Sequence, residues 1–276
     1  MKINELFISV SITAALVLAV GGLVLLKLKS KLFWQRWFTW LGITVLFTSA
    51  YLLGQTAFNI LVCLIAFGMM FELVRLLRFE IFSTTLVLLL SWYDFFQIIE
   101  GRAAAYFFYL IPIAVFVFGL SESEKGLRVR SAVGGMYGSL FISLSFIQLV
   151  QYPDKSLALL LAVACFDVCS FVGGKTLAKL PVLRIHFSPK TSANKTVGGI
   201  VGGALALVLV LGVLGKLTLV SFVLVLVGAV LGDYLESWLK RLAKVKDAGN
   251  WLPGFGGFLD RFDSLLLLAP LAVFIF

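Results

Sequence analysis

The sequence predicts an all-α integral membrane protein, a bundle of about ten transmembrane helices with a polar, cytoplasm-facing site in its C-terminal half. Of 276 residues, 61% are hydrophobic and 13% are charged, and the mean hydropathy is +1.06. This composition leaves too little polar surface to cover a water-soluble globule, so lipid is the expected solvent. Apolar runs of about 17–22 residues recur, which favours helical spans over the shorter strands of soluble proteins.

Ten apolar segments predict the spans in chain order. They cover residues 6–26, 37–53, 56–74, 81–99, 103–120, 131–150, 157–174, 197–215, 217–235 and 263–276. The first resembles a retained span more than a secretory signal, because Glu5 precedes it, Lys27 and Lys29 follow it, and no small-residue cleavage site ends it. We expect one polytopic domain over 1–276, with N-terminal spans in 1–156 and a polar, catalytic half in 157–276.

The positive charges predict the orientation. When alternate connections are assigned to opposite sides, 19 of the 23 Lys and Arg residues fall on one side, in 27–36, 75–80, 121–130, 175–196 and 237–262. Cytoplasmic loops of membrane proteins are enriched in Lys and Arg, so we expect these loops in the cytoplasm and both termini outside. The net charge of +9 is then explained by cytoplasmic loops that lie next to anionic lipid headgroups, so we expect no nucleic-acid partner. The predicted location is a bacterial inner membrane.

Cysteine and histidine usage excludes several classes of chemistry. Cys63, Cys165 and Cys169 all fall in apolar segments without a C-x-x-C or Cys/His cluster, which indicates packing residues. The chain has a single histidine, His186, which argues against His-ligated zinc and against a Ser-His-Asp mechanism. Carboxylates and cations must therefore carry any reaction.

Acidic residues concentrate near the C-terminus with helical spacing. Asp233 and Glu236 are three residues apart, and Ser237 and Lys240 fall on the same helical stripe. Asp260 and Asp263 repeat this spacing at the start of the last segment. Carboxylates at the membrane-embedded end of a helix are energetically costly unless cations or metals pair with them. Oxygen ligands of this kind suit Mg²⁺.

Cations and glycines lie between the two acidic pairs. The cations are Lys240, Arg241, Lys244, Lys246 and Arg261. Their density suits a triphosphate, and Gly256 and Gly257 allow a tight turn with close backbone approach to phosphate oxygens. Each feature alone is typical of any positively charged loop beside a membrane. Together they predict metal-assisted phosphoryl or nucleotidyl transfer.

The stretch from Ser237 to Asp263 resembles the signature of the CDP-diacylglycerol synthase (phosphatidate cytidylyltransferase) family. That signature runs S-x-x-K-R, K-D, P-G-H-G-G and D-R-x-D. Twelve of its thirteen fixed positions match, namely Ser237, Lys240, Arg241, Lys246, Asp247, Pro253, Gly254, Gly256, Gly257, Asp260, Arg261 and Asp263. Phe255 stands where the signature has His. The chain is thus identified as a divergent member of this family.

An earlier stretch is similar to the family in less detail. Asp167, Phe171, Gly174, Lys175 and Lys179 follow the pattern D-x-x-A-Y-x-x-G-R-x-x-G-K. The next element, S-P-K-K-T-W-E-G, either starts at Ser188 or aligns without gaps over 192–199, and its Trp-Glu pair is absent in both cases. The resemblance covers residues 160–276. The first half of the chain shares only its hydrophobicity with the family.

The resemblance implies that phosphatidate attacks the α-phosphorus of CTP, giving CDP-diacylglycerol and pyrophosphate. It implies Mg²⁺, with a second cation possible. The implied metal ligands are Asp233, Asp260, Asp263 and Asp247. The implied phosphate-binding and catalytic cations are Lys240, Arg241, Lys246 and Arg261. The implied substrate-binding residues are Ser237, Ser188, Lys195, Lys175, Gly256 and Gly257.

Several alternatives stay open at this point. Phe255 and the missing Trp-Glu pair are compatible with a weakly active or re-purposed paralogue that acts on another lipid phosphate, or with a non-catalytic membrane protein. A transporter would carry polar residues near the membrane midplane in two symmetric halves, whereas the polar residues here gather at one face.

The glycines at 198, 199, 202 and 203 suit either close approach to phosphate or close helix packing. The sequence leaves open CTP against dCTP, the acyl chains and a homodimer. Glu72 and Asp94 are weak candidates, expected to reach water at span ends.

Overall fold

The computed structural model is a bundle of α-helices, and the described residues contain no β-strand. It describes residues 4–28, 31–100, 107–122, 128–177, 180–185, 196–245, 249, 256–271 and 275. The helices are α1 (Glu5–Leu28), α2 (Lys31–Leu53), α3 (Gln55–Leu76), α4 (Ile81–Ile99), α5 (Phe107–Glu122), α6 (Arg128–Gln151), α7 (Pro153–Thr176), α8 (Val197–Val213), α9 (Leu219–Leu242) and α10 (Leu259–Leu268), with short 3₁₀ helices η2 (Pro181–Arg184) and η3 (Ala269–Leu271).

Local sequence signals fix several of the helix ends. Gly54, at φ 110°, allows the chain to reverse between α2 and α3, a conformation that favours glycine. The Thr196 hydroxyl accepts a hydrogen bond from the Gly199 amide and caps α8. Thr218 and Ser221 form a reciprocal capping box at the start of α9. α8 and α9 therefore begin where unpaired amides find a side-chain partner.

The helices match the apolar segments that the sequence predicts, but several ends differ: α2 begins at Lys31 and not at 37, and α9 continues to Leu242 and does not end at 235. Within the described part of the chain, six helices are long and apolar enough to cross a membrane: Glu5–Leu23, Gln55–Leu76, Ile81–Ile99, Ser131–Gln151, Pro153–Thr176 and Leu219–Arg241. Shorter apolar helices cover Trp37–Leu53, Leu110–Ser121 and Val197–Val213. The last predicted segment differs, because α10 begins at Leu259, before the expected position 263, and so includes Asp260 and Asp263.

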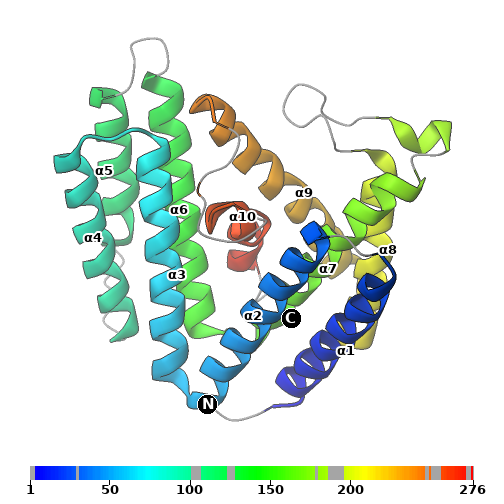
Figure 1. Cartoon of the computed structure of the whole chain (residues 1–276). Helices are drawn as coiled ribbons and strands as arrows, with labels where there is room; N and C mark the ends of the chain where they lie inside the picture. Colours follow the sequence, from blue (N-terminus) through cyan, green and yellow to red (C-terminus); the bar gives the residue numbers. More distant parts are fainter. Residues whose placement is uncertain are drawn as a thin grey trace.

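Successive helices alternate in direction, so their connections fall at two ends of the bundle (Figure 1). The odd-numbered helices α1 to α9 run toward the upper end of the view in Figure 1, and the even-numbered helices α2 to α8 run back. The described Lys and Arg residues at the ends of α3 and α9, among them Arg75, Lys240 and Arg241, lie toward this upper end. The described helices therefore alternate in direction, as the assignment of alternate connections to opposite sides requires.

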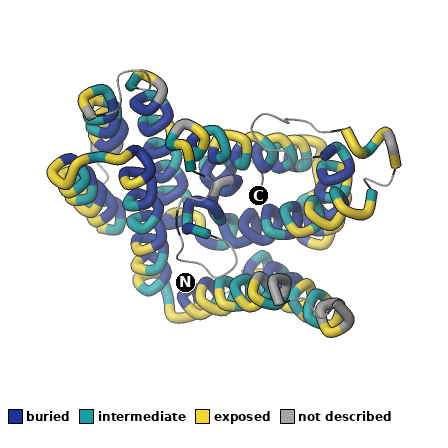
Figure 2. The backbone as a smooth tube through the Cα atoms, turned by 45° about the horizontal axis from the view of Figure 1, so that its top comes forward, coloured by how far each residue is buried: buried dark blue, intermediate teal, exposed yellow. Residues whose placement is uncertain are grey.

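The centre of the bundle is occupied by α10, which packs against α3, α6, α7 and α9. Ser145 of α6 donates a hydrogen bond to the Leu266 carbonyl, and Ser264 of α10 donates one to the Ala229 carbonyl of α9. Buried residues lie on the inward faces of the helices and exposed ones on the outward faces (Figure 2). The first turn of α10 is thereby held inside the bundle.

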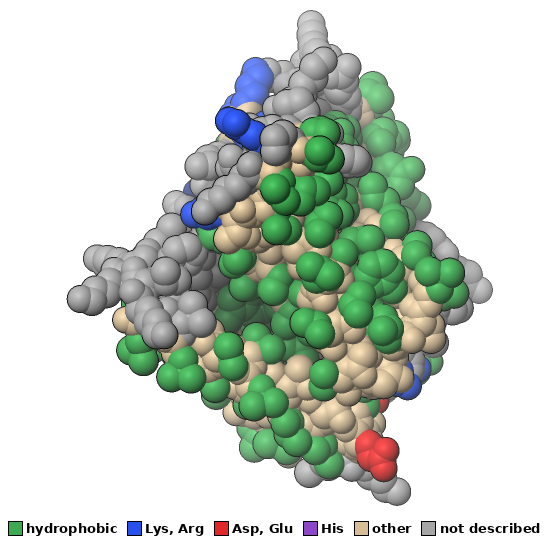
Figure 3. Space-filling model, turned by 90° about the vertical axis from the view of Figure 1, so that its right-hand side faces the viewer, with side chains coloured by type: hydrophobic (Ala, Val, Ile, Leu, Met, Phe, Trp, Pro, Cys, Tyr) green, Lys and Arg blue, Asp and Glu red, His purple; other side chains and the backbone are tan. Residues whose placement is uncertain are grey.

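The outer faces are apolar. Leu23, Leu205, Leu209 and Leu219 are each at least 60% exposed. The side of the molecule that carries α8 is mostly hydrophobic, with few charged side chains (Figure 3). An apolar surface of this extent would aggregate in water, so it faces lipid. The chain is a multi-pass membrane protein.

Candidate active site

The last turns of α9 present the acidic stripe that the sequence predicts. α9 continues without a break to Leu242, so Asp233, Glu236, Ser237 and Lys240 share one helical stripe. The Lys240 ammonium lies 2.6 Å from Glu236 Oε1, and the Glu236 side chain is only 4% exposed. Glu236 is therefore a buried carboxylate with a cation from the next turn of the same helix.

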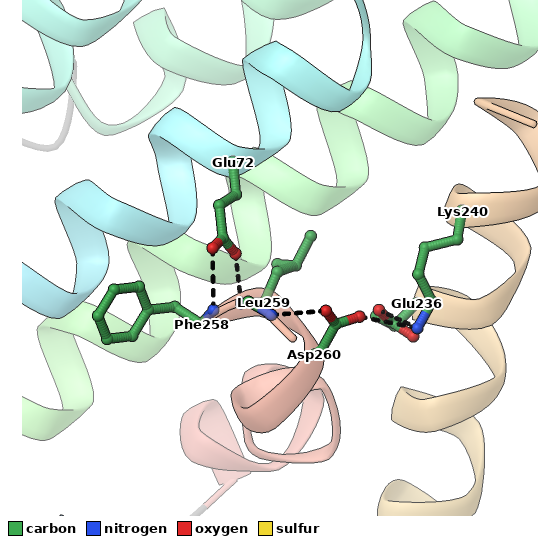
Figure 4. Close-up of polar contacts among 7 residues, drawn as sticks. Glu72, Glu236, Lys240, Phe258, Leu259 and Asp260 are labelled. Atoms are coloured by element: carbon green, nitrogen blue, oxygen red, sulfur yellow. Dashed lines mark hydrogen bonds and ion pairs between the residues drawn. The ribbon is translucent and has the colours of Figure 1, made fainter. Parts of the chain in front are cut away.

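The first turn of α10 supplies a second carboxylate to the same cation (Figure 4). Lys240 Nζ lies 2.8 Å from Asp260 Oδ1, and the Gly257 amide donates to Asp260 Oδ2 at 2.8 Å. The Asp260 side chain is 5% exposed. Glu236 and Asp260 thus converge on one positive charge from two helices that are adjacent in space but separated in sequence.

Glu72 of α3 binds the start of α10 from the other side (Figure 4). Its two carboxylate oxygens accept hydrogen bonds from the amides of Phe258, at 3.0 Å, and Leu259, at 2.8 Å. Glu72 is 1% exposed. The first amides of a helix have no partner within the helix and carry the positive end of its dipole, so a carboxylate is a favourable cap there.

Gly256 and Gly257 are required by these carboxylates. Gly256 has φ +90°, and a Cβ there would lie 2.5 Å from Asp260 Oδ2. At Gly257 the three nearest atoms to a Cβ would all belong to the Glu72 carboxylate, in overlap with it. The sequence led us to expect close approach to phosphate oxygens, whereas the side chains nearest to these glycines in the described structure are carboxylates of the protein itself.

The Asp260 carboxyl is held in its ionised form. α10 has ten residues and is not one of the candidate spans. Burial raises the pKa of this carboxyl, but hydrogen bonds with Glu236, Lys240 and the Gly257 amide outweigh burial and hold the pKa below its ordinary value. Asp260 is therefore negatively charged at neutral pH, as a cation ligand must be.

The donor set fits a hard cation. Among the residues that the structure describes, no group of three or more His, Cys, Asp or Glu side chains lies in metal-binding proximity. Glu236 and Asp260 do converge on a positive charge, however, and carboxylate oxygens are the ligands that Mg²⁺ prefers. Of the predicted metal ligands, Asp233 is half-buried on α9 and Asp263 belongs to α10. The Asp263 side chain and all of Asp247 lie outside the described residues.

The other predicted site residues are distributed around this cluster. Arg241 is exposed in the last turn of α9, Ser237 is half-buried on the same helix, and Arg261 is half-buried in the first turn of α10. Lys175 is exposed in the last turn of α7, with its ammonium 4.3 Å from the centre of the Phe171 ring. Ser188, Lys195 and Lys246 lie outside the described residues, as do His186 and Phe255.

The glycines of α8 serve helix packing. A Cβ on Gly202 would lie 2.6 Å from the Cys169 carbonyl oxygen of α7, and one on Gly203 would overlap Ser170 and Phe166. α7 and α8 therefore approach through small residues, as small-xxx-small helix pairs do in membranes. Of the two interpretations that the sequence left open, the described contacts support packing.

Glu236 is not among the predicted site residues, and the sequence makes Glu72 only a weak candidate. The expectation that Glu72 and Asp94 reach water at span ends is wrong, because they are 1% and 4% exposed. Their buried position follows from the inward faces of α3 and α4. A signal existed for Glu236, which the sequence places on the Asp233 stripe. For Glu72, the only signal was an ionisable residue inside an apolar run.

Comparison with known proteins shows the family of the chain. A sequence model of the cytidylyltransferase family matches residues 34–276. The chain is 31% identical over 265 residues to the phosphatidate cytidylyltransferase of Bacillus subtilis, covering 87% of this chain and 96% of that protein. It is 30% identical over 241 residues to that of Aquifex aeolicus, covering 83% and 85%. The chain belongs to the cytidylyltransferase family.

Membership of the cytidylyltransferase family extends further along the chain than the sequence motifs indicated. The motifs gave a resemblance over 160–276, whereas the match begins at residue 34. A higher identity covers a shorter stretch: the Helicobacter pylori phosphatidate cytidylyltransferase is 48% identical over 117 residues, which are 39% of this chain and 41% of that protein. The match therefore includes α3, whose Glu72 contacts the start of α10.

Proposed function

We propose that the chain is a membrane-bound CTP:phosphatidate cytidylyltransferase, which transfers CMP from CTP to phosphatidate and makes CDP-diacylglycerol for phospholipid biosynthesis. The observation that carries the proposal is the convergence of Glu236, Lys240 and Asp260 within a chain that belongs to the cytidylyltransferase family. Relatives named phosphatidate cytidylyltransferase match it over most of their length.

The proposed reaction is a displacement at phosphorus. A phosphate oxygen of phosphatidate forms a bond to the α-phosphorus of CTP, and the bond from that phosphorus to the bridging oxygen of the β-phosphate breaks. Pyrophosphate leaves with that oxygen. A phosphate monoester with a second pKa near 6 is largely dianionic at pH 7, so the nucleophile needs little help from a general base. The enzyme must position two polyanions and offset their charge.

The predicted site residues, together with Glu236, divide between these two tasks. Asp260, Glu236 and Asp233 are proposed to hold a divalent cation, with support from Asp263 and Asp247. Lys240, Arg241, Arg261 and Lys246 are proposed to bind phosphate groups, as is Lys175. Ser237, Ser188 and Lys195 are proposed to donate hydrogen bonds to phosphate oxygens, and the backbone at Gly256 and Gly257 to shape the turn beside them.

Mg²⁺ is the proposed cation. When bound, it would neutralise phosphate charge and polarise the phosphorus toward attack. The buried carboxylates Glu236 and Asp260 now share the Lys240 ammonium. A divalent cation held by these two carboxylates would take the place of the Lys240 ammonium. Lys240 could then bind the phosphate groups of CTP.

We further propose that the upper end of the bundle in Figure 1 faces the cytoplasm of a bacterial cell, where CTP is available. The concentration of Lys and Arg in the connections at that end supports this orientation. Glu72 lies one turn before the end of α3, and Lys240 lies in the last turn of α9. The cluster is therefore near that end. On this proposal the shorter apolar helices and segment 263–276 also cross the inner membrane, giving about ten spans.

The test is an assay of the purified protein in detergent or vesicles. CTP, Mg²⁺ and phosphatidate are supplied together and singly omitted, and CDP-diacylglycerol and pyrophosphate are measured. Product that requires all three supports the proposal. If phosphatidate gives no product while another lipid phosphate does, the chain is a re-purposed paralogue, an alternative that Phe255 motivates. If no lipid phosphate reacts, the proposed function is wrong.

A further inference from the structure

We infer that Glu72 is a positioning residue for the reaction: from α3, in the N-terminal half of the chain, it holds the segment 256–260 in the conformation that directs Asp260 toward α9. The inference rests on the proposed function for its catalytic consequence. Its structural part stands on the contacts of Glu72 alone.

Both oxygens of Glu72 are used, each on a different amide. Oε1 accepts from the Phe258 amide and Oε2 accepts from the Leu259 amide, across 186 and 187 residues of sequence. The side chain is 1% exposed, so water does not compete for these bonds. Hydrogen bonds from amides to a buried charge are stronger than neutral ones, and each fixes the direction of one peptide plane. Two adjacent planes are thus oriented by one carboxylate.

Asp260 is oriented by the same stretch of backbone. Its Oδ2 accepts from the Gly257 amide, which leaves Oδ1 directed at Lys240 of α9. Consecutive amides from Gly257 to Leu259 therefore end on carboxylates, the first on Asp260 and the next two on Glu72. A change at Glu72 would release the two planes between Gly257 and Asp260, and the Asp260 carboxylate would lose its fixed direction. Glu72 acts through Asp260, so it positions and does not itself react.

Gly257 is coupled to Glu72 by steric fit. The three atoms nearest to a Cβ at this position would be the two oxygens and the Cδ of Glu72. Gly257 has no positive φ that would itself require glycine. On this geometry, Gly257 must be glycine because the Glu72 carboxylate occupies the space beside it. The two residues should therefore show non-additive effects when both are changed.

The first experiment compares Glu72→Gln with a matched control, Asp94→Asn. Asp94 is another buried carboxylate in an apolar helix, but it lies thirteen residues along α4 from Ile81, roughly 20 Å from the upper end. The Gln amide keeps the size of Glu72 but turns an NH₂ group toward one of the two amides. We expect kcat to fall roughly 10- to 150-fold with KM for CTP nearly unchanged. The control should retain wild-type kcat.

A second readout does not depend on activity. Hydrogen–deuterium exchange of the full-length protein in detergent is followed in peptides that cover 256–262. In Glu72→Gln the Phe258 and Leu259 amides should exchange roughly tenfold faster or more, and peptides of α7 should be unchanged. If exchange stays at the wild-type rate, Glu72 does not hold this segment and the inference is overturned. If exchange rises while kcat stays at the wild-type value, the positioning role is overturned.

A third experiment, with variants of Gly257 and Glu72, tests the steric coupling between these two residues and controls for misfolding. Gly257→Ala should lower kcat in the wild-type background and have little further effect in Glu72→Ala, where the space is open. Full additivity of the two changes would overturn the steric link. If the wild-type protein makes no CDP-lipid at all, the proposed function fails, and exchange at 256–262 alone decides whether Glu72 anchors α10. The two failures are therefore distinguishable.

Discussion

Lys240 and Asp260 join the last turn of α9 to the first turn of α10 through an ion pair of 2.8 Å, and Glu236 lies 2.6 Å from the same ammonium. Two carboxylates and one cation are buried together, so each depends on the others to offset the loss of water. Removal of any one member would therefore leave a buried charge without its partner.

Lys240→Met should destabilise the folded protein. The change leaves Glu236 and Asp260 facing one another at 4% and 5% exposure without the ammonium between them, and breaking a buried pair from one side costs about 3–5 kcal/mol. The thermal unfolding midpoint in detergent should fall. Added Mg²⁺ should recover part of the loss in this variant. Lys155→Ala, at the opposite end of the bundle, is the control. An unchanged midpoint for Lys240→Met would contradict the electrostatic role of the cluster.

Asp260→Asn and Asp233→Asn should each lower turnover by at least about 10³-fold, because the proposed cation loses a charged ligand at the reacting phosphate. Membrane insertion and the elution volume in size-exclusion chromatography should stay at wild-type values. The assay is CDP-diacylglycerol formation at saturating CTP. Near-normal turnover in both variants would eliminate this pair as the metal site.

Gly256→Ala should be damaging for two separate reasons. The residue has φ +90°, which costs an L-residue about 1 kcal/mol or more, and the new Cβ would lie 2.5 Å from Asp260 Oδ2. We expect at least a tenfold loss of activity, on the order of 1.4 kcal/mol. The matched control is Gly42→Ala, in the middle of α2, where a Cβ meets nothing within 4 Å and a helix favours alanine. Equal effects of the two changes would show that the turn at Gly256 tolerates a side chain.

Much of the fold could be predicted because hydrophobic runs determine helices in lipid. The stripe of Asp233, Glu236 and Lys240 followed from helical spacing alone, and α9 confirms that it is one helical face. The match of Asp260 to a family signature marked it as important before its partners were known. These are local features, in which a few neighbouring residues carry the whole signal.

What the sequence could not give is the set of contacts between distant helices. The bonds from Phe258 and Leu259 to Glu72 cross 186 and 187 residues, and no local spacing encodes them. For the same reason the sequence predicts phosphate oxygens beside Gly257, whereas the structure describes the Glu72 carboxylate there. Burial of Asp94 and Glu72 likewise depends on which face of α3 or α4 turns inward, and an all-apolar helix does not reveal that.

The orientation in the membrane can be tested by labelling single cysteines. With Cys63, Cys165 and Cys169 replaced, a cysteine placed at 125 or at 244 should react with an impermeant maleimide only after the cells are permeabilised, because both positions belong to the Lys- and Arg-rich side. A cysteine at 216, in the connection at the opposite end, should react in intact cells. Ready labelling at 125 and 244 from outside would reverse the proposed topology.

The last prediction concerns Phe255, which lies outside the described residues and stands where the resembling signature has His. The next residue, Gly256, has φ +90°, and the Gly257 amide donates a hydrogen bond to Asp260 Oδ2, so position 255 directly precedes the turn that positions Asp260. If the signature His donates a charge-assisted hydrogen bond to a phosphate, its absence should cost about 1.5–3 kcal/mol, or roughly 10- to 150-fold in rate.

The wild-type protein should therefore be a weak cytidylyltransferase toward phosphatidate, and Phe255→His should raise its turnover. A titrating imidazole would also add a pH dependence near 6–7, with the higher rate on the acidic side, because only the protonated ring carries the positive charge that the phosphate binds. The measurement is kcat from pH 5.5 to 8 for both proteins, with Phe258→His as a control at a ring outside the signature position. A wild-type rate equal to that of the Bacillus subtilis enzyme, with no gain in the His variant, would show that position 255 contributes little and that the turn and its carboxylates suffice.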